Sequence, residues 1–258
     1  MASATFKDHF SSGSANYAAH RPTYPIALVD ELAAVSPGHG LALDCGCGTG
    51  QLSVLLAERF DRVVATDASA AQVESAQPRD GVTYRAALAE DSGLPGASVD
   101  LITVAQAAHW LDLDKFYDEV RRIARPNAVV ALITYGVLHV EGPVDPLVQR
   151  FYYETIGAYW PAERRHVEEG YRSLPFPFQE RQLPRLAIEV WWTLEDLLGY
   201  VNTWSAVKAA EKALGANPAL SLAAEMREAW GDPQVRRRVT WPLSLRVGTV
   251  QSTGSAEE

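Results

Sequence analysis

The segment LALDCGCGTG, residues 41–50, constrains the fold of this chain more than any other part of the sequence. A short apolar run ends at Asp44, and three glycines then alternate at positions 46, 48 and 50. Apolar residues follow at helical spacing, namely Leu52, Leu55, Leu56 and Phe60. A strand, a glycine turn and a helix are therefore predicted next to one another, which is how a βαβ unit of a parallel sheet begins.

The same alternation of short apolar strands and amphipathic helices repeats over the first 140 residues. A helix is predicted after Pro25, and another has Phe116, Val120 and Ile123 on one face. Strands are predicted at 41–45, 62–67, 82–85, 100–105 and 129–135. Repeated units of this length predict an α/β fold, a doubly wound, Rossmann-like and mostly parallel seven-stranded sheet with helices on both faces.

The pattern changes after Gly142, which indicates a second kind of structure. Residues 141–204 are rich in aromatic side chains interleaved with prolines and charges, and we predict a helical, aromatic-rich cap or lid inserted there. Residues 205–250 are expected to add helices and an antiparallel edge strand at 239–250 that complete the core formed by residues 1–140. Residues 251–258 are expected to be a frayed tail.

Composition excludes several classes of function. The net charge of -9 argues against nucleic acid as a partner. The N-terminus has no apolar core of the signal-peptide kind and no stretch is long enough to span a membrane, so we expect a cytoplasmic protein that does not bind membranes. Cys45 and Cys47 are too close together for an unstrained disulfide, and the histidines show no metal-binding spacing. We predict two small buried thiols and no metal.

The glycine turn could cradle phosphates or another ligand, and its neighbours narrow the choice. No lysine follows the glycines, which excludes an ATP or GTP loop, and Gln51 stands where a nicotinamide or flavin fingerprint would continue. Asp67 ends the next predicted strand, where a carboxylate can accept hydrogen bonds from both hydroxyls of a ribose. The glycines and Asp67 together predict a ligand of the adenosine type.

These motifs, with AEDSGLP, SVDLITVAQAAHW and the turn RPNA in the same order, resemble the class I S-adenosylmethionine-dependent methyltransferases over about residues 5–140. AQAAHW and the N-terminal ANYAAHRPTYP resemble in particular the small-molecule group that includes trans-aconitate methyltransferases. The resemblance implies S-adenosylmethionine as cofactor and a small-molecule methyl acceptor, such as a carboxylate or a small natural product. Oligomeric state is not indicated.

The resemblance also implies roles for particular residues. Asp44 and the turn Gly46, Cys47, Gly48 and Gly50 would line the methionine half of the cofactor, Asp67 would take the ribose hydroxyls, and Ala68 would pack on the adenine. Further contacts would come from Ala89 and Glu90 at the adenine edge, from Gln106 at the methionine ammonium, and from Tyr17 and Arg21 in the covering N-terminal segment. Leu88 stands where many members have an acid, so the acid that contacts the adenine stays open between Glu90 and Asp91.

Fewer residues of the sequence can be assigned to binding the methyl acceptor. His109 follows the fourth strand and is the candidate general base, although a carboxylate acceptor would need no base. The structural alternative is that His109 bonds a backbone group and Trp110 packs in the core. Asp100, Trp191 and Trp192 are expected to be structural, and Arg164, Arg165 and Arg172 either form a solvated face or meet an anionic substrate.

Two other functions share these features. A cofactor-binding scaffold without catalysis would keep the same binding residues, and only a product assay separates it from an enzyme. A nicotinamide-dependent oxidoreductase could use the same fold, and Gln51 argues against it.

Overall fold

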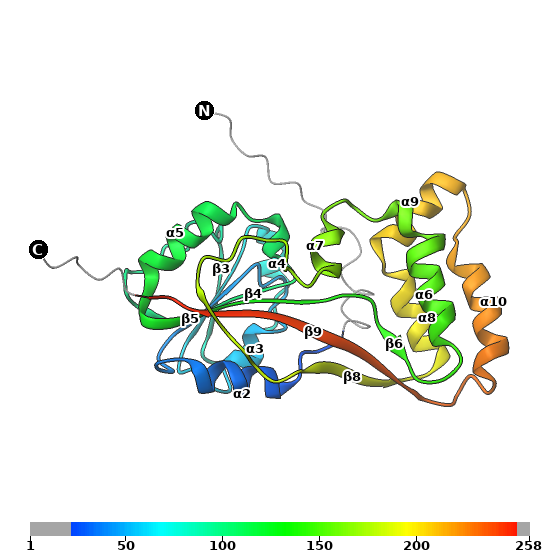
Figure 1. Cartoon of the computed structure of the whole chain (residues 1–258), viewed down its shortest axis with the longest axis horizontal. Coiled ribbons are helices and arrows are strands. Elements are labelled where there is room, and N and C mark those ends of the chain that lie inside the picture. The colour runs from blue at the N-terminus through cyan, green and yellow to red at the C-terminus, as the bar shows by residue number, and fades with distance from the viewer. Residues whose placement is uncertain (1–21, 252–258) are drawn as a thin grey trace, which may run out of the picture.

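The structure is a computed structural model that describes residues 22–251 (Figure 1). Tyr17 and Arg21, two of the predicted cofactor contacts, lie outside the described residues. Within the described part, no helix combines the length and the apolar character that a membrane span requires. The chain forms an open sheet at one end and a layer of helices at the other, and one long strand joins them (Figure 1).

Five parallel strands form the first half of the sheet in the order β3-β2-β1-β4-β5. Their bounds are β1 (Ala42–Cys45), β2 (Val63–Asp67), β3 (Val82–Ala86), β4 (Val99–Ala105) and β5 (Ala124–Tyr135). The predicted parallel, doubly wound arrangement is confirmed. Because the strand order reverses between β1 and β4, the turns that follow these two strands lie at the crevice where such sheets bind ligands.

Helices cover both faces of this half of the sheet. They are α2 (Ile26–Val35), α3 (Ser53–Leu56), α4 (Ala70–Glu74) and α5 (Leu113–Ile123). Side chains of β4 alternate between the faces, since Leu101 packs in the cluster with α2 and α3, whereas Ile102 packs in the cluster with α5. The helix after the glycine turn is shorter than expected, because only Ser53–Leu56 is α-helical and turns precede and follow it.

The last strand, β9 (Arg237–Thr249), is antiparallel as predicted, but the prediction of an edge strand is wrong. Its carboxyl half pairs with β5 on one side and with β7 (Gln179–Arg181) on the other. Its amino half pairs with β6 (His139–Val140) and β8 (Ala187–Trp192). Within residues 22–251 the sheet therefore has nine strands, not seven, because two segments of the expected cap, β7 and β8, add strands beside β9.

The helical layer lies beyond the amino end of β9 (Figure 1). It contains α6 (Asp145–Arg150), a π-helical turn at Phe151–Thr155, a 3-10 turn at Gly157–Tyr159, α8 (Leu194–Asn202), α9 (Ser205–Leu214) and α10 (Ala219–Trp230). Leu197 and Val201 of α8 share one buried cluster with Val207 of α9 and Leu222 of α10. The expected boundary at residue 204 therefore runs through a single packed group of helices, because the buried aliphatic face of α8 packs in the same cluster as α9 and α10.

Two of the three residues that were expected to have a structural role pack or bond within the fold. Asp100 is buried, accepts hydrogen bonds from the N–H groups of Gly40 and Leu41, and pairs with Arg125 at 3.1 Å. Trp192 packs against Tyr200 and Trp241. Trp191, in contrast, is 56% exposed, because alternation along β8 turns it to the opposite side, so its predicted packing role is wrong.

Candidate functional site

The glycine turn after β1 has a backbone that favours glycine. Gly46, Gly48 and Gly50 have φ angles of 65°, 56° and 87°, which side chains disfavour. A Cβ on Gly46 would lie only 2.6 Å from Cβ of Ala107, in the turn after β4. The N–H of Cys47 donates to the carbonyl of Thr66 in β2, so the turn is fixed to the neighbouring strand. The two cysteines are free, buried thiols as predicted, and burial raises the pKa of both.

Asp44 fixes the glycine turn through hydrogen bonds of its carboxylate. Its carboxylate accepts hydrogen bonds from the hydroxyls of Ser53, at 2.6 Å, and Thr103, at 2.8 Å. Burial raises the pKa of Asp44 to about 6, against the opposing effect of these two hydrogen bonds. Asp44 therefore ties the start of α3 to β4 and fixes the position of the glycine turn between them.

Asp67, at the end of β2, faces the same turn. One carboxylate oxygen accepts a hydrogen bond from the N–H of Gly48 and the other from the N–H of Ser69, each at 2.8 Å. Ser69 also caps α4, because its side chain accepts a hydrogen bond from the N–H of Gln72. A carboxylate offers about four lone-pair sites, so Asp67 retains capacity for about two further donors. Two hydroxyls of a ribose are donors of this kind.

A small cavity of about 30 Å³ lies between the turn and the end of β4. The predicted residues Asp44, Gly46, Cys47 and Gly48 line it. It is also lined by four residues that the sequence reasoning missed, namely Tyr24, Gln51, Leu52 and Ala105. Ala105 could have been found, because it ends β4 beside the switch point. Tyr24 lies in the N-terminal motif ANYAAHRPTYP, but the resemblance gave this residue no role of its own.

The residues predicted at the adenine lie along the next edge of the sheet. Ala68 is exposed directly after β2, and Ala89 is buried. Glu90 accepts a hydrogen bond from the N–H of Asp112, the cap of α5, at 2.9 Å. Its carboxylate therefore already supports α5, and an adenine contact from Glu90 stays a prediction.

Gln106 follows β4 in a left-handed conformation, with φ 59°. Its side-chain amide donates to the carbonyl of Tyr135 at 2.9 Å and accepts from the hydroxyl of Thr134 at 2.8 Å. Both polar atoms of the side chain are thus bound to the end of β5. Gln106 fixes the two strand ends to each other, and contact with a methionine ammonium stays a prediction.

His109 lies in a 3-10 turn, Ala108–Trp110, that follows Gln106. Its Nδ1 is 2.9 Å from the phenol oxygen of Tyr171, which the structural alternative of a backbone partner did not foresee. Burial, with the positive charge of Arg164 and then His166, lowers the pKa of His109 to about 4. The imidazole is therefore neutral at pH 7 and a weak base. Trp110 is 39% exposed and is not packed in the core, because its turn lies at the surface.

The segment around α7 (Arg164–Glu168) covers this turn. Tyr171 is fully buried, and burial raises the pKa of its phenol, against hydrogen bonds from Thr134 and from the backbone of Ala108 and His109. Arg164 lies toward this side, whereas Arg165 is exposed and pairs with Glu169 at 3.8 Å. Of the three candidate arginines, Arg164 alone acts on both His109 and Tyr171.

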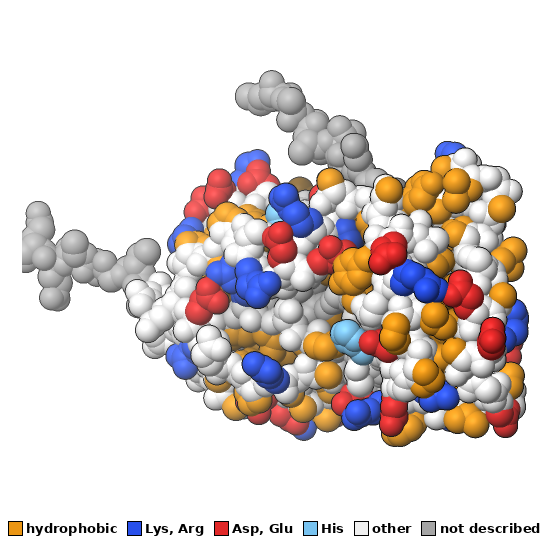
Figure 2. All heavy atoms as spheres, turned by 45° about the vertical axis from the view of Figure 1, so that its right-hand side comes forward, with side chains coloured by type: hydrophobic (Ala, Val, Ile, Leu, Met, Phe, Trp, Pro, Cys, Tyr) orange, Lys and Arg blue, Asp and Glu red, His pale blue; other side chains and the backbone are white. Residues whose placement is uncertain are grey.

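A larger cleft, of about 490 Å³, lies beside the turn after α7 and over β9. Charged side chains of both signs surround the hollow between the two ends of the molecule (Figure 2). The lining includes Glu168, Glu169, Glu180, Arg172 and Arg246, and Arg246 is bound by Glu180. None of the predicted cofactor contacts lines this cleft, and no group of three or more His, Cys, Asp or Glu in residues 22–251 is placed to hold a metal ion.

The geometry fits a nucleoside cofactor without a pyrophosphate. Asp44 and Asp67 both lie beside the glycine turn, and neither forms an ion pair with a cation in the described part of the chain. The negative charges of two carboxylates would repel a pyrophosphate. Asp67, in contrast, can accept hydrogen bonds from ribose hydroxyls, and the glycine turn has no side chains that would keep a ligand away from its backbone. The fold and the site define an α/β enzyme of the class that binds an adenosyl cofactor at the switch point.

Comparison with known proteins places the chain in a family. A family model described as a methyltransferase domain matches residues 43–132. A methyltransferase of Dictyostelium discoideum is 38% identical over 216 residues, which cover 81% of each chain. The structure of a type II methyltransferase from Anaeromyxobacter dehalogenans superposes with a TM-score of 0.87 at 51% identity, and covers 90% of this chain and 98% of that one.

An S-adenosylmethionine-dependent methyltransferase of Saccharomyces cerevisiae is 31% identical over 131 residues, which cover 47% of this chain and 45% of the yeast protein. The chain belongs to the class I S-adenosylmethionine-dependent methyltransferases, and its cofactor is S-adenosylmethionine. It is an enzyme of this family, and the alternative of a nicotinamide-dependent oxidoreductase is wrong.

Proposed function

We propose that the chain transfers the methyl group to a small molecule bound beside His109, where the segment around α7 covers the ends of β4 and β5. The observation that carries this proposal is the contact of 2.9 Å between Tyr171 and His109. It places the covering segment directly over the turn that follows β4. In enzymes with this sheet, ligands bind outside these strand ends. A small acceptor fits such a covered position better than a macromolecule does.

The contacts suggest which residues bind the cofactor and which cover the acceptor. S-adenosylmethionine supplies a methyl group already activated by its sulfonium. Asp67 would hold the ribose hydroxyls, and Asp44 would keep the glycine turn in place beneath the methionine part. Residues 1–140 would form the cofactor-binding core, and the segment that begins at 141 would exclude water from the reacting groups.

The remaining task of the protein is to orient the acceptor. A well-aligned nucleophile gains several kcal/mol from proximity alone. His109, with its low pKa, is poorly matched to removing a proton from a hydroxyl group. A carboxylate is already ionised at pH 7 and needs no base. We therefore place organic acids first among acceptors, with other small natural products second, and assign His109 to binding the acceptor rather than to proton removal.

A product assay tests this proposal. The full chain is incubated with S-adenosylmethionine and a set of small carboxylic acids, phenols and amines, and release of S-adenosylhomocysteine is measured. We expect turnover with at least one small acceptor, and loss of turnover in Asp67→Ala. Binding of S-adenosylhomocysteine with no turnover of any of these small acceptors would contradict the proposed acceptor class.

A further inference from the structure

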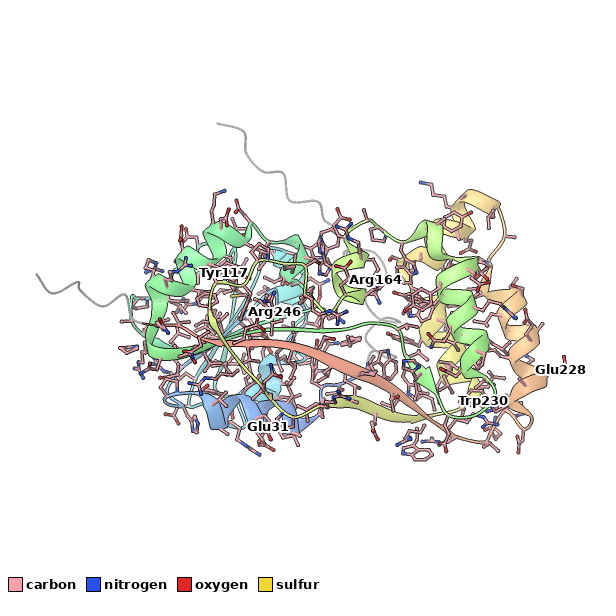
Figure 3. The ribbon with its side chains drawn as sticks, viewed as in Figure 1. Glu31, Tyr117, Arg164, Glu228, Trp230 and Arg246 are labelled. Atoms are coloured by element: carbon pink, nitrogen blue, oxygen red, sulfur yellow. The ribbon has the colours of Figure 1, made fainter. Side chains whose placement is uncertain are left out.

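Arg164, the first residue of α7, lies between the sheet and the helical layer (Figure 3). Its Nε donates a hydrogen bond to the phenol oxygen of Tyr152 at 2.6 Å. Its guanidinium carbon lies 4.9 Å from the centre of the Trp160 ring and 5.6 Å from that of Tyr152. Tyr152 is only 1% exposed, so the arginine is held from one side by a rigid aromatic surface.

No acid in the described part of the chain forms an ion pair with this guanidinium. Within residues 22–251, Arg164 forms no ion pair, and its two Nη atoms donate to no other group. Glu168, one turn further along α7, approaches the hydroxyl of Tyr152 instead. Taking a cation partly out of water without a paired anion costs free energy, which an incoming anion would offset.

Arg164 belongs to the same short segment that covers His109. Tyr171 follows α7, and its N–H donates a hydrogen bond to the carbonyl of His166 in that helix. Its phenol oxygen contacts Nδ1 of His109. The positive charge of Arg164 lowers the pKa of both His109 and Tyr171, against the larger effect of burial on Tyr171. An anion on the Nη atoms of Arg164 would thus lie near the turn that follows β4, where the acceptor is expected.

We propose that Arg164 recognises the methyl acceptor, and that the acceptor is an organic acid whose carboxylate pairs with the Nη atoms of this guanidinium. The planar fork of arginine matches a carboxylate through two parallel hydrogen bonds, and Tyr152 and Trp160 fix the fork in one orientation. This inference rests on the proposed function, because it assigns the acceptor class of the same site.

The experiment measures anion binding to the full chain saturated with S-adenosylhomocysteine. The probes are benzoate, phenylacetate, succinate and tricarballylate, each compared with its amide, and binding is followed by tryptophan fluorescence and calorimetry. We expect at least one acid to bind, and its amide to bind at least tenfold more weakly. Arg164→Gln should raise the Kd of that acid at least tenfold, whereas Arg164→Lys should raise it less.

Arg165→Gln is the matched control, since Arg165 is on the same helix, is exposed and should leave acid binding unchanged. The inference is overturned if no acid binds, if amides bind equally well, or if Arg164→Gln has no effect. Methyl transfer to a neutral acceptor at an undiminished rate in Arg164→Gln would overturn this inference and leave the proposed function standing. Failure to bind S-adenosylhomocysteine at all would overturn both.

Discussion

The phenol oxygen of Tyr171 lies 2.9 Å from Nδ1 of His109, although 62 residues separate the two along the chain. Tyr171 has a φ of 61°, which is uncommon for a residue with a side chain, and it is fully buried. The covering segment thus adopts a costly backbone conformation at the residue that contacts His109, the histidine proposed to bind the acceptor. Such strain is often found at functional sites.

The low pKa of His109 predicts how methyl transfer depends on pH. Since burial lowers this pKa to about 4, the imidazole is neutral from about pH 5 upward and should add no titration near pH 6.5. We expect His109 to add no step to kcat/KM for a carboxylate acceptor between about pH 5.5 and 8, so that any change near pH 6 comes from Asp44 and remains in His109→Asn. Initial rates measured across this range check the prediction, and a step near pH 6.5 that disappears in His109→Asn would contradict it.

Loss of the Asp67 carboxylate should weaken cofactor binding. Asp67→Ala removes the acceptor for two ribose hydroxyls and frees the N–H groups of Gly48 and Ser69. Hydrogen bonds to a charged group contribute about 1.5–3 kcal/mol each, so we expect the Kd of S-adenosylhomocysteine to rise at least tenfold. Calorimetric titration measures it. Asp80→Ala is the control, because Asp80 is an exposed acid before β3. An equal rise in Kd in this variant would contradict a direct contact between Asp67 and the ribose.

A methyl group on Gly46 should be far more harmful than one on Gly93. Both residues have nearly the same φ, 65° and 67°, so the backbone cost of alanine is similar and about 1–2 kcal/mol. A Cβ on Gly46 would meet Ala107 at 2.6 Å, whereas one on Gly93 would meet nothing within 4 Å. Overpacking should cost Gly46→Ala a further 1–3 kcal/mol or so.

Urea unfolding of the two alanine variants measures this difference, and titration with S-adenosylhomocysteine shows whether the turn still binds. We expect weakened binding in Gly46→Ala alone. Equal free energies of unfolding for the two variants would show that the contact with Ala107 relaxes without cost.

Asp44 should give stability a definite dependence on pH. Its pKa rises from 3.8 to about 6 on folding, so the folded protein binds more protons than the unfolded chain between these values. The free energy of unfolding should therefore fall as the pH rises from about 4 to 6, by an amount on the order of 3 kcal/mol, and then stay level. Asp44→Asn should remove this dependence.

The measurement is the difference in free energy of unfolding between the wild type and Asp44→Asn at several pH values. Other acids titrate in both proteins and cancel in this difference. A difference that does not vary with pH would mean that Asp44 keeps its usual pKa.

The cofactor half of the site could be predicted because its residues stand next to recognisable local patterns. Asp44 and Asp67 each end an apolar strand, and parallel strands bring such ends to one edge of the sheet. The acceptor half could be predicted only in part, because His109 and Arg164 were named as candidates but their neighbours were not. The positions of Arg164, at the start of α7, and of Tyr171, in the turn after it, depend on long-range packing against Tyr152 and His109, which no sequence period encodes.

The course of β9 was also beyond prediction. Its alternating pattern indicates a strand but does not say how many neighbours it has. The predicted strand at 239–250 had nearly the observed length, but this length was not taken to mean that the strand extends beyond β5, where it pairs with β6 and β8.

This strand makes the sheet and the helical layer one cooperative unit. Among its four partner strands, β9 is hydrogen-bonded to β5 along one half and to β8 along the other, and a single buried cluster contains Val129 of the sheet and Leu222 of α10. Separating the helical layer would break a continuous strand and expose that shared interior. The chain should therefore lose both parts in one unfolding transition, and amide protons in the middle of β9 should exchange with solvent mainly through global unfolding.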